Sequence, residues 1–486
     1  LVPRGSGTSM GGGAVGPGVV VDLGRLHALG AVDAAGLRVA VGPGVTRGAV
    51  ERAAAAAGLR FPVDPSSGAY CTVGGMASTN AAGAHTLKYG ATRPWVHALE
   101  CVFADGSRAW LRRGEPAPAH VPAVARALAA LPRWRDAVAR GLPARPAVRK
   151  DTSGYAVAEY AESGELVDLL VGSEGTLALF VSLELRLAPR AAATSSLLAA
   201  FPTLEQATDA AGRARELGAS ACELLDRTFL DVAASGGATD VPPGSEAVLL
   251  AEVEGSTHED AGALAERLAT AFRAAGASEV RLALDAATET VLWELRHRAS
   301  PTIARLHPHL RSLQFIEDGA VPPARLPEYV RGVREALARH GVRGVIFGHA
   351  GDGHVHVNPL LDVDEPTWRE QVAGILDDVT ALTQRLGGTM AGEHGDGRLR
   401  TPLLPRLRGE ETMALYAEVK AAFDPDGLLN PGVKVPLPGQ RPLGAIKYDP
   451  ALPPLPEPAR RVLDHVARER AYAEPRLALL ERAVKG

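Results

Sequence analysis

Pro3-Arg4-Gly5-Ser6-Gly7-Thr8-Ser9 is the stretch on which the interpretation of the first domain depends. Its glycines and hydroxyl residues leave several consecutive backbone N–H groups unobstructed, and such a run of donors is what a pyrophosphate requires. Alone the signal is weak, because an ordinary glycine-rich turn has the same composition. The first six residues also spell a protease recognition site used in expression tags, which is an alternative origin for them. The glycine-rich run continues to Gly13, and residues 19–23 then predict a buried strand, which favours the loop.

Two later segments share this small, hydroxyl-rich character. The first is Thr72-Val73-Gly74-Gly75-Met76-Ala77-Ser78-Thr79-Asn80-Ala81-Ala82-Gly83, which suits a backbone that closes over a flat ring. The second is Gly172-Ser173-Glu174-Gly175-Thr176-Leu177. These two segments make a ligand-binding role for the opening loop more credible than that loop does alone.

Two other segments, residues 348–356 and 392–397, hold the residue types that bind a divalent metal and move a proton. Imidazole nitrogen and carboxylate oxygen suit zinc or manganese, and a catalytic site needs only three protein ligands. A hydrogen-bonded structural pair is the usual explanation for two histidines. The Gly-Asp-Gly spacing between His349 and His356 and the distant Glu393-His394 pair favour a metal site instead.

Length and composition set the outer limits. A chain of 486 residues exceeds one ordinary core, so we expect two or three domains. A formal net charge of -4 gives no footprint for nucleic acid, and no apolar run approaches the roughly 20 residues that span a bilayer. The three cysteines, Cys71, Cys101 and Cys222, lack the spacing of a disulfide framework, a zinc knuckle or an iron–sulfur cluster. We expect a cytoplasmic protein, with peripheral membrane association left open.

Hydrophobic periodicity predicts the elements that carry these segments. The first part mixes short strands with turns and an alanine-rich helix near residues 46–57. Strands are predicted over 247–253, 279–284 and 343–347, the last leading into the histidine segment. Helices are predicted over 203–217, 258–276, 286–299, 324–340, 366–386 and 459–484.

In order and spacing, the three small-residue segments resemble the FAD-binding domain of the vanillyl-alcohol oxidase flavoprotein superfamily and not the Rossmann fingerprint. The His segment, residues 348–356, and the Glu-His segment, residues 392–397, resemble the C-terminal domain of the superfamily's FAD-linked 2-hydroxy acid dehydrogenases. That group holds D-lactate and D-2-hydroxyglutarate dehydrogenases and glycolate oxidase subunits. Phe423-Asp424-Pro425-Asp426-Gly427-Leu428-Leu429-Asn430-Pro431-Gly432 is similar to the closing motif of that group. The resemblance extends to about residue 435.

The resemblance implies an α+β protein: a two-subdomain FAD-binding domain over residues 1–190, then a substrate- and metal-binding α/β domain with an antiparallel sheet over 191–434. A Pro-rich linker and a C-terminal helix would occupy 435–486. Members of the family begin with a strand–helix–strand unit that has no counterpart here, so we expect an N-terminally incomplete FAD domain. Residues 78–85 and 392–400 are most similar to family members that are fused to a C-terminal iron–sulfur domain. With three scattered cysteines, we expect no such domain in this chain.

The resemblance also implies roles for individual residues. FAD would be bound by Arg4, Gly5, Ser6, Gly7, Thr8, Ser9, Thr72, Gly75, Thr79, Asn80, Gly172, Glu174, Gly175 and Asn430. A divalent metal, zinc before manganese, would be held by His349, His356 and Glu393, with His394 as the general base. Arg296 matches the arginine for the substrate carboxylate, and Ser300 the hydroxyl that assists it.

These roles satisfy the chemistry of oxidising a small D-2-hydroxy acid to the 2-oxo acid. The reaction needs a cation for the carboxylate, a Lewis acid for the hydroxyl, a base for its proton, and a flavin N5 that accepts hydride. An iron–sulfur protein, a quinone or a cytochrome would take the electrons, and a homodimer is compatible with the sequence. A flavin-poor subunit of an electron-transfer complex is the alternative, and a plain metallohydrolase a third hypothesis.

Several of these residues have an alternative interpretation. His354 shares a strand face with His356, so it is a further ligand or a residue of the site's rim, and we favour the rim. Arg296 is equally readable as a solvated helix residue. Asp352 and Asp396, between glycines, are expected to form turns, and covalent attachment of flavin to His85 is disfavoured.

The sequence departs from the family at two lysine positions. Lys434 follows Val433, whereas relatives place lysine directly after the glycine of the closing motif, so Lys434 is given no role. A lysine that some relatives use near the substrate has no counterpart around residues 314–318, which argues against a second carboxylate on the substrate.

Overall fold

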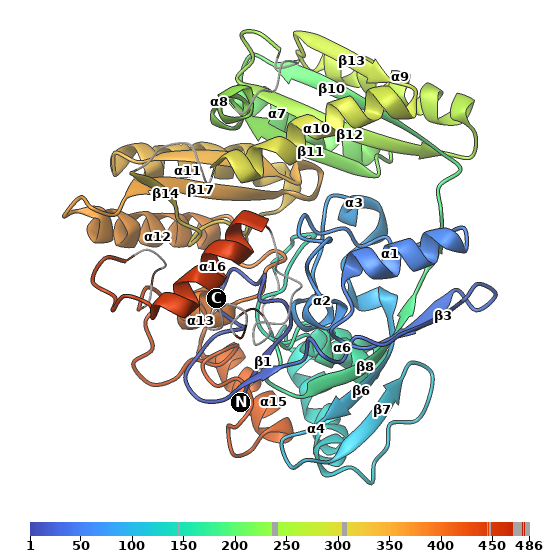
Figure 1. The fold of residues 1–486 in the computed structure, drawn as a ribbon, viewed down its shortest axis with the longest axis vertical. Coiled ribbons are helices and arrows are strands. Elements are labelled where there is room, and N and C mark those ends of the chain that lie inside the picture. Colours follow the sequence, from blue (N-terminus) through green and yellow to red (C-terminus); the bar gives the residue numbers. More distant parts are fainter. Residues whose placement is uncertain are drawn as a thin grey trace.

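Two large antiparallel sheets, each packed against helices, divide the chain into two domains that lie side by side (Figure 1). The computed structural model describes residues 1–143, 146–235, 242–303, 309–444, 446, 449–469, 479 and 481. The expected α+β class is confirmed, with an antiparallel sheet in the second domain.

The sheet of the first domain has the strand order β3-β4-β8-β6-β7, and neighbouring strands are antiparallel. Its strands are β3 (Leu29–Asp33), β4 (Arg38–Val41), β6 (Val96–Val102), β7 (Arg108–Arg112) and β8 (Leu179–Arg186). Val39 and Val41 are buried while Arg38 and Ala40 are exposed, the alternation of a strand with one face on a core. Helices α4 (Pro122–Ala139), α5 (Val157–Ser163) and α6 (Leu166–Leu170) contribute to this core.

Shorter elements complete this domain, and one of them carries the small-residue segment that begins at Thr72. They are α1 (Arg47–Ala56), β5 (Leu59–Arg60), α2 (Val73–Thr79), α3 (Thr86–Tyr89), the 3₁₀ turn η1 (Arg93–Trp95) and β9 (Ala188–Pro189), which pairs with β5. The hydroxyl of Thr72 accepts a hydrogen bond from the N–H of Gly75 and so starts α2, as an N-cap does.

Strand β2 (Val20–Asp22) forms where a buried strand was predicted, parallel to β1 (Val2–Arg4). The predicted burial is wrong, because Val20 is 45% exposed. Consecutive β-branched residues favour extended backbone whether or not a core covers them, and a two-stranded sheet has few neighbours to cover it.

The second domain is built on the strand order β13-β10-β12-β11-β16-β17-β14, with β15 paired to β17. Its strands are β10 (Ala193–Phe201), β11 (Ala221–Asp226), β12 (Ala247–Gly255), β13 (Glu279–Ala283), β14 (Leu310–Ser312), β15 (Gly319–Ala320), β16 (Arg343–Gly348) and β17 (His354–Asp362). Its helices are α7 (Leu204–Glu216), α8 (Arg227–Ser235), α9 (His258–Ala274), α10 (Ala286–Ile303), α11 (Leu326–Arg339) and α12 (Trp368–Arg385), with turns η2 (Pro323–Arg325) and η3 (Ala350–Asp352).

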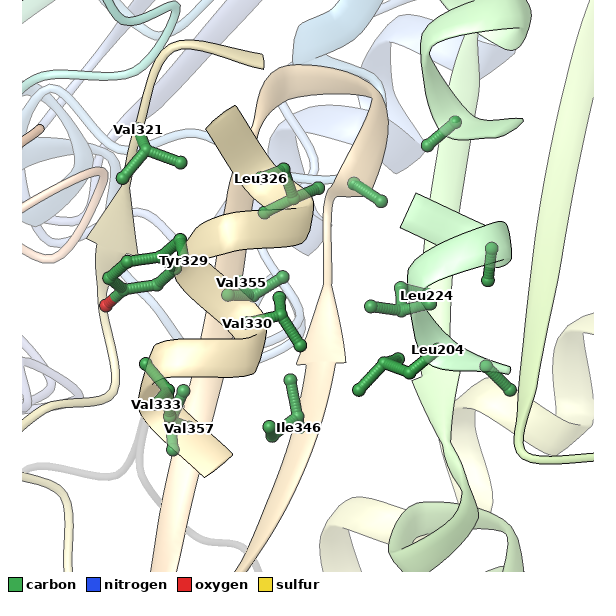
Figure 2. Close-up of a cluster of buried hydrophobic side chains, with 14 of the residues drawn as sticks. Leu204, Leu224, Val321, Leu326, Tyr329, Val330, Val333, Ile346, Val355 and Val357 are labelled. Atoms are coloured by element: carbon green, nitrogen blue, oxygen red, sulfur yellow. The ribbon is translucent and has the colours of Figure 1, made fainter. Parts of the chain in front are cut away.

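Both faces of this sheet are covered, because alternate residues of β10 enter different cores. Leu197 and Ala199 pack in the larger core with α7, α9, α11 and α12, whereas Leu198 and Ala200 pack with α8 and α10. Figure 2 shows part of the larger core, where Tyr329 and Val330 of α11 lie over β16 and β17. Such two-sided burial fixes the register of the strands that deliver the histidines.

The predicted helices and strands of this domain form, with ends that differ by a few residues. The largest difference is α10, which continues to Ile303 instead of ending at 299. The predicted C-terminal helix is confirmed as α16 (Glu457–Glu469), while most of its continuation to 484 lies outside the described residues.

After the Glu-His segment the chain returns to the first domain. The returning elements are α13 (Gly397–Arg400), η4 (Thr401–Leu403), α14 (Leu404–Arg408) and α15 (Glu410–Phe423). Leu415, Tyr416, Val419 and Phe423 belong to the hydrophobic core of the first domain. The Glu-His loop is therefore held between the two domains. No helix in the described part of the chain has both the length and the apolar character to cross a membrane.

Candidate active site between the two domains

A cavity that is partly open to solvent lies where the opening loop meets the Glu-His loop, residues 392–397. Of the residues predicted to bind the cofactor, it is lined by Arg4, Gly5, Ser6, Gly7, Thr8, Ser9, Thr72, Gly75, Thr79, Glu174 and Gly175. Glu393 and His394 line the same cavity.

The opening loop fits the backbone role predicted for it. A Cβ atom on Gly5 would lie 2.2 Å from the hydroxyl of Thr72, and one on Gly7, whose φ is +73°, would lie 2.2 Å from the guanidinium of Arg4. Only glycine allows this close approach. The hydroxyl of Ser9 is buried against the cavity without a hydrogen-bond partner within the described protein, as expected of a group that serves a polar ligand.

Three residues predicted to contact the cofactor lie outside the cavity lining. Asn80, in the left-handed conformation that ends α2, accepts a hydrogen bond from the N–H of Arg93. Gly172 is on the lining of a second cavity. Asn430 is fully buried and donates to the carbonyls of Gly13 and Glu174. These contacts position neighbouring loops.

Glu174 clamps the two domains together at the edge of the cavity. Its carboxylate accepts hydrogen bonds from the N–H groups of Asp396 and Gly397. Lys434, fully buried, lies 2.9 Å from Glu174 and 3.0 Å from the Asp396 carboxylate. Asp396 is thus part of a buried ion cluster and not only a turn former, and Lys434 has the structural role that the sequence did not assign.

Asp318 holds the Glu-His loop in place. It is the residue directly before β15 and follows Glu317 in the sequence. The Asp318 carboxylate accepts hydrogen bonds from the N–H of Glu393, at 3.1 Å, and of His394, at 2.8 Å. Two backbone amides on one carboxylate fix the direction of both side chains. They point toward His349, which precedes η3, and toward the histidines of β17.

Glu393 is the centre of a cluster of four histidines. Its Oε1 lies 3.4 Å from Nε2 of His349, 3.3 Å from Nε2 of His356 and 3.5 Å from Nε2 of His394. Its Oε2 lies 4.0 Å from Nδ1 of His354. Two ligands that each sit about 2.0–2.1 Å from one ion lie at most about 4.2 Å apart, so these separations fit a shared ion. The predicted metal ligands are therefore brought together.

The opposite nitrogen of each cluster histidine is bound to an acceptor. Nδ1 of His349 pairs with Glu223 at 2.5 Å, and Nδ1 of His356 donates to the Glu317 carbonyl at 2.9 Å. Metal-binding histidines typically carry such outer acceptors, which fix the tautomer and turn the other nitrogen toward the ion. The donor set is thus suited to a divalent cation.

His394, the predicted base, continues a buried chain through Glu317 to Arg400. Its Nδ1 lies 3.2 Å from Glu317, whose carboxylate also binds the guanidinium of Arg400. Burial lowers the pKa of His394, but Asp318, Glu317 and Glu393 outweigh it and raise the pKa to about 10. A cation bound at Glu393 would oppose the effect of these carboxylates and lower the pKa of His394, and a base at neutral pH needs the neutral imidazole.

His354 does not lie on the rim that was predicted for it. It is fully buried, its Nε2 pairs with Asp318 at 2.9 Å, and burial lowers its pKa to about 3. Gly392 passes so close that a Cβ there would lie 2.8 Å from the ring, and Ala320 of β15 pairs with the same residue. The rim prediction fails because strand alternation gives the face of a side chain but not what covers it.

Lys150 reaches this cluster from the first domain, and sequence reasoning missed it. Its buried ammonium donates to the carbonyl of Gly83 at 3.0 Å and to Oε2 of Glu393 at 3.1 Å. It also lies 3.6 Å from Asp352, which binds Arg149 at 3.0 Å. Asp352 is therefore the buried partner of two cations, beyond its expected role in a turn.

Arg296 is buried and not solvated. Its Nε donates to Glu223 at 2.9 Å, and Glu223 carries the chain on to His349. Arg296 does not line the cavity beside the opening loop, although it is linked to the cluster. The side chain of Ser300 lies outside the described residues. The proposed role of Arg296 toward a carboxylate stays a prediction.

His85 lies at the domain interface and not on the cavity lining. Its Nδ1 pairs with Asp64 at 2.6 Å and its Nε2 with Glu252 of β12 at 2.8 Å. Both ring nitrogens are therefore engaged by carboxylates, one from each domain, which supports our disfavouring of a flavin attachment there.

The sequence signal for the missed acidic residues is their position within or next to apolar runs, and it becomes clear only once those runs are known to be buried. Glu223 lies inside β11, whose residues are all buried, and Glu317 and Asp318 follow the apolar residues Phe315 and Ile316. A carboxylate within an apolar run requires a buried partner. That rule flags these acids, but it does not identify their partners.

The cavity of the opening loop and the buried His/Glu cluster thus meet at Glu393 and His394, and comparisons with known proteins identify the family. Residues 190–433 match the family "FAD linked oxidases, C-terminal domain", and residues 1–112 match the "FAD binding domain". The chain belongs to the FAD-linked oxidase family of the vanillyl-alcohol oxidase superfamily.

Relatives of this chain include three kinds of enzyme. The glycolate oxidase subunit GlcD of Escherichia coli is 30% identical over 90% of this chain and 79% of the relative. The D-lactate dehydrogenase of Archaeoglobus fulgidus is 32% identical over 88% of this chain and 84% of its own length. The D-2-hydroxyglutarate dehydrogenase of Pseudomonas putida is 29% identical over 89% of this chain but 45% of its own length.

Solved structures show the same fold at lower identity. A 4-ethylphenol oxidase from Gulosibacter chungangensis superimposes with a TM-score of 0.63 at 13% identity, covering 89% of this chain and 84% of that one. An alkyldihydroxyacetonephosphate synthase gives a TM-score of 0.60 at 16% identity, covering 88% of this chain and 72% of that one.

Proposed function

We propose that the protein is an FAD-dependent dehydrogenase that oxidises a small D-2-hydroxy acid to the 2-oxo acid with the help of a divalent metal. The observation that carries the proposal is that Glu393 and His394 line the same cavity as residues 4–9. Relatives named for glycolate, D-lactate and D-2-hydroxyglutarate support the substrate class. The opening loop, with Ser9 unpartnered, supports FAD as the occupant.

The Glu393 cluster would hold the metal through His349, His356 and Glu393 itself. The outer acceptors of both histidines leave the inner nitrogens able to bind a cation. The inner nitrogens, Nε2 of His356 and Nε2 of His349, lie 3.3 and 3.4 Å from Oε1 of Glu393. These three atoms would face one another directly if no cation lay between them. When bound, the ion would supply a Lewis acid for the substrate hydroxyl, and FAD would supply the hydride acceptor.

His394 is the residue that would take the hydroxyl proton. Its Nδ1 is engaged by Glu317, so Nε2, which faces Glu393, is the nitrogen available to the substrate. The C2–H bond breaks as the C2=O bond forms, with two electrons leaving as hydride and the hydroxyl proton going to His394. Arg296, oriented by Glu223, is the proposed cation for the substrate carboxylate.

The electrons would leave on a separate acceptor, for which an iron–sulfur protein, a quinone and a cytochrome are the candidates. The proposal includes no particular acceptor residue. An artificial acceptor dye therefore suffices for turnover assays of the isolated chain.

An anaerobic screen of the purified protein tests this function. Protein reconstituted with FAD is mixed with D and L forms of lactate and 2-hydroxyglutarate, and with glycolate, while flavin absorbance is followed. We expect bleaching by at least one of the achiral or D acids and little by the L forms. Protein that binds no FAD, or bound FAD that none of these acids reduces, would contradict the proposal.

A further inference from the structure

The least explained group in the cluster is the Nδ1 atom of His354. The side chain has no exposed surface, and Nδ1 has no hydrogen-bond partner within the described protein. Leaving a buried polar atom unpaired costs about 1–3 kcal/mol, so such atoms usually serve a ligand. The other nitrogen, Nε2, is held by Asp318 at 2.9 Å, which fixes the ring and aims Nδ1 inward.

Nδ1 of His354 is aimed at the proposed metal site. It lies 4.0 Å from Oε2 of Glu393, and one donor atom each from His349, His354, His356 and Glu393 all lie within 4.8 Å of one another. The His354 ring packs against that of His356, with centroids 4.7 Å apart, and against that of His349, at 5.4 Å. Three imidazoles therefore surround one carboxylate.

A second arrangement, with Asp318, His356, Glu393 and His394, is also close enough to hold an ion. It is disfavoured because the Asp318 carboxylate already serves the N–H groups of Glu393 and His394 and the His354 ring. It would also occupy His394, the group proposed to move the proton.

We propose that His354 is a fourth protein ligand, so that the site is a three-histidine, one-glutamate centre. The inference rests on the proposed function, because it concerns the metal of that same site. Zinc prefers four ligands, and a zinc ion with four protein ligands has no position left for substrate. Ions that accept six ligands, such as Mn²⁺ or Co²⁺, keep two positions for the hydroxyl and carboxylate oxygens of a 2-hydroxy acid. The centre is therefore assigned to a six-coordinate ion and not to the zinc expected from the sequence.

Metal binding by His354→Gln tests the assignment. A glutamine amide reaches the place of Nε2 and keeps a donor for Asp318, but it offers no nitrogen in the place of Nδ1. Chelator-treated, FAD-loaded wild type and variant are titrated with Mn²⁺ and Co²⁺ by calorimetry, and the visible spectrum of the Co²⁺ forms is recorded. His97→Gln is the matched control, because His97 is also a buried histidine with an unpartnered Nδ1, held through Nε2 by Arg38 at 2.8 Å.

We expect His354→Gln to weaken Mn²⁺ binding by at least about tenfold and to change the Co²⁺ spectrum, while His97→Gln matches the wild type. Unchanged affinity and spectrum in His354→Gln would overturn the fourth ligand while leaving the proposed function intact. Wild type that binds no divalent ion would overturn the metal of the proposed function as well. His354→Leu, which offers no donor atom in the place of Nδ1, is measured in the same way if His354→Gln loses FAD or unfolds.

Discussion

Two buried chains of interacting side chains have the same composition and meet at Glu393; they are Arg296–Glu223–His349 and Arg400–Glu317–His394. In both, the glutamate accepts from an arginine and from Nδ1 of a histidine, and Nε2 of that histidine faces Glu393. The difference is access: His394 lines the cavity of the opening loop and His349 does not. An Arg–Glu pair that binds Nδ1 of a histidine thus orients a proposed metal ligand, His349, in one chain and the proposed proton acceptor, His394, in the other.

The electrostatics of the two chains are also parallel. The arginine and histidine beside each glutamate outweigh burial and hold the pKa of Glu223 and of Glu317 below the usual range. Burial lowers the pKa of His349, but Glu223 and Glu393 raise it to about 9. Both glutamates are therefore carboxylates at neutral pH.

The largest effect is expected from His394→Gln. Loss of a general base slows its step by about 10²–10⁴-fold, so anaerobic reduction of bound FAD by the substrate slows by that factor. The metal and FAD contents stay at the wild-type level, because His394 holds neither in this account. Stopped-flow absorbance and elemental analysis measure both quantities. A rate within threefold of the wild type would remove His394 from the reaction.

His349→Gln is expected to act through the metal instead. Its affinity for Mn²⁺ falls by at least about 10- to 100-fold, since a ligand contributes no less than its outer partners do. Saturating Mn²⁺ then restores part of the rate of flavin reduction, which it cannot do for His394→Gln. Metal titration of the rate measures the contrast. Equal responses of both variants to added metal would erase the distinction between the two chains.

Substituting Glu223 or Glu317, the partners of His349 and His394, should separate metal affinity from the rate of flavin reduction in the same way, with smaller effects. Glu223→Gln weakens metal affinity by about 10–100-fold, the range found for outer partners of ligating histidines. Glu317→Gln slows flavin reduction at saturating metal and leaves metal affinity within about threefold, because its partner is the base. Calorimetry and stopped-flow reduction of both variants make the comparison. Loss of metal affinity in Glu317→Gln alone would reverse the assignment.

The smallest effect concerns His85, which also lies between two carboxylates but outside the cavity. Burial lowers its pKa, yet Asp64 and Glu252 outweigh burial and raise it well above 6.5. A raised pKa in the folded state contributes stability that is full below about pH 6.5 and is lost as pH rises through the folded value. Denaturant unfolding should show His85→Gln less stable by about 1.5–3 kcal/mol at pH 6, with the difference shrinking at alkaline pH. A difference that grows with pH would mean that His85 is neutral.

Among the residues predicted from the sequence, those that the structure brings to the cavity or the cluster lie in contiguous motifs. The opening loop carries glycines that backbone geometry requires, and His349, His356, Glu393 and His394 lie in short segments with metal-binding spacing. Helices and strands of the second domain followed from their periodicity, because both faces of its sheet are buried.

The residues missed are those whose partners are distant in the sequence. Lys150 meets Glu393 across 243 positions, and Glu223 meets His349 across 126. No local pattern encodes such contacts, since they depend on how the two domains pack. The rim position of His354 failed for the same reason, because Gly392 and β15, which cover it, come from other parts of the chain.

The most direct test of the central claim, that the cavity of the opening loop and the His/Glu cluster form one active site, is flavin reduction with and without the metal. FAD-loaded protein is treated with a chelator, mixed anaerobically with the D-2-hydroxy acid that reduces it best, and followed by flavin absorbance before and after Mn²⁺ is restored. We predict that bleaching is lost on chelation and returns with the ion, while the FAD content stays constant. Bleaching at the same rate in the metal-free protein would show that the cluster and the flavin do not act together.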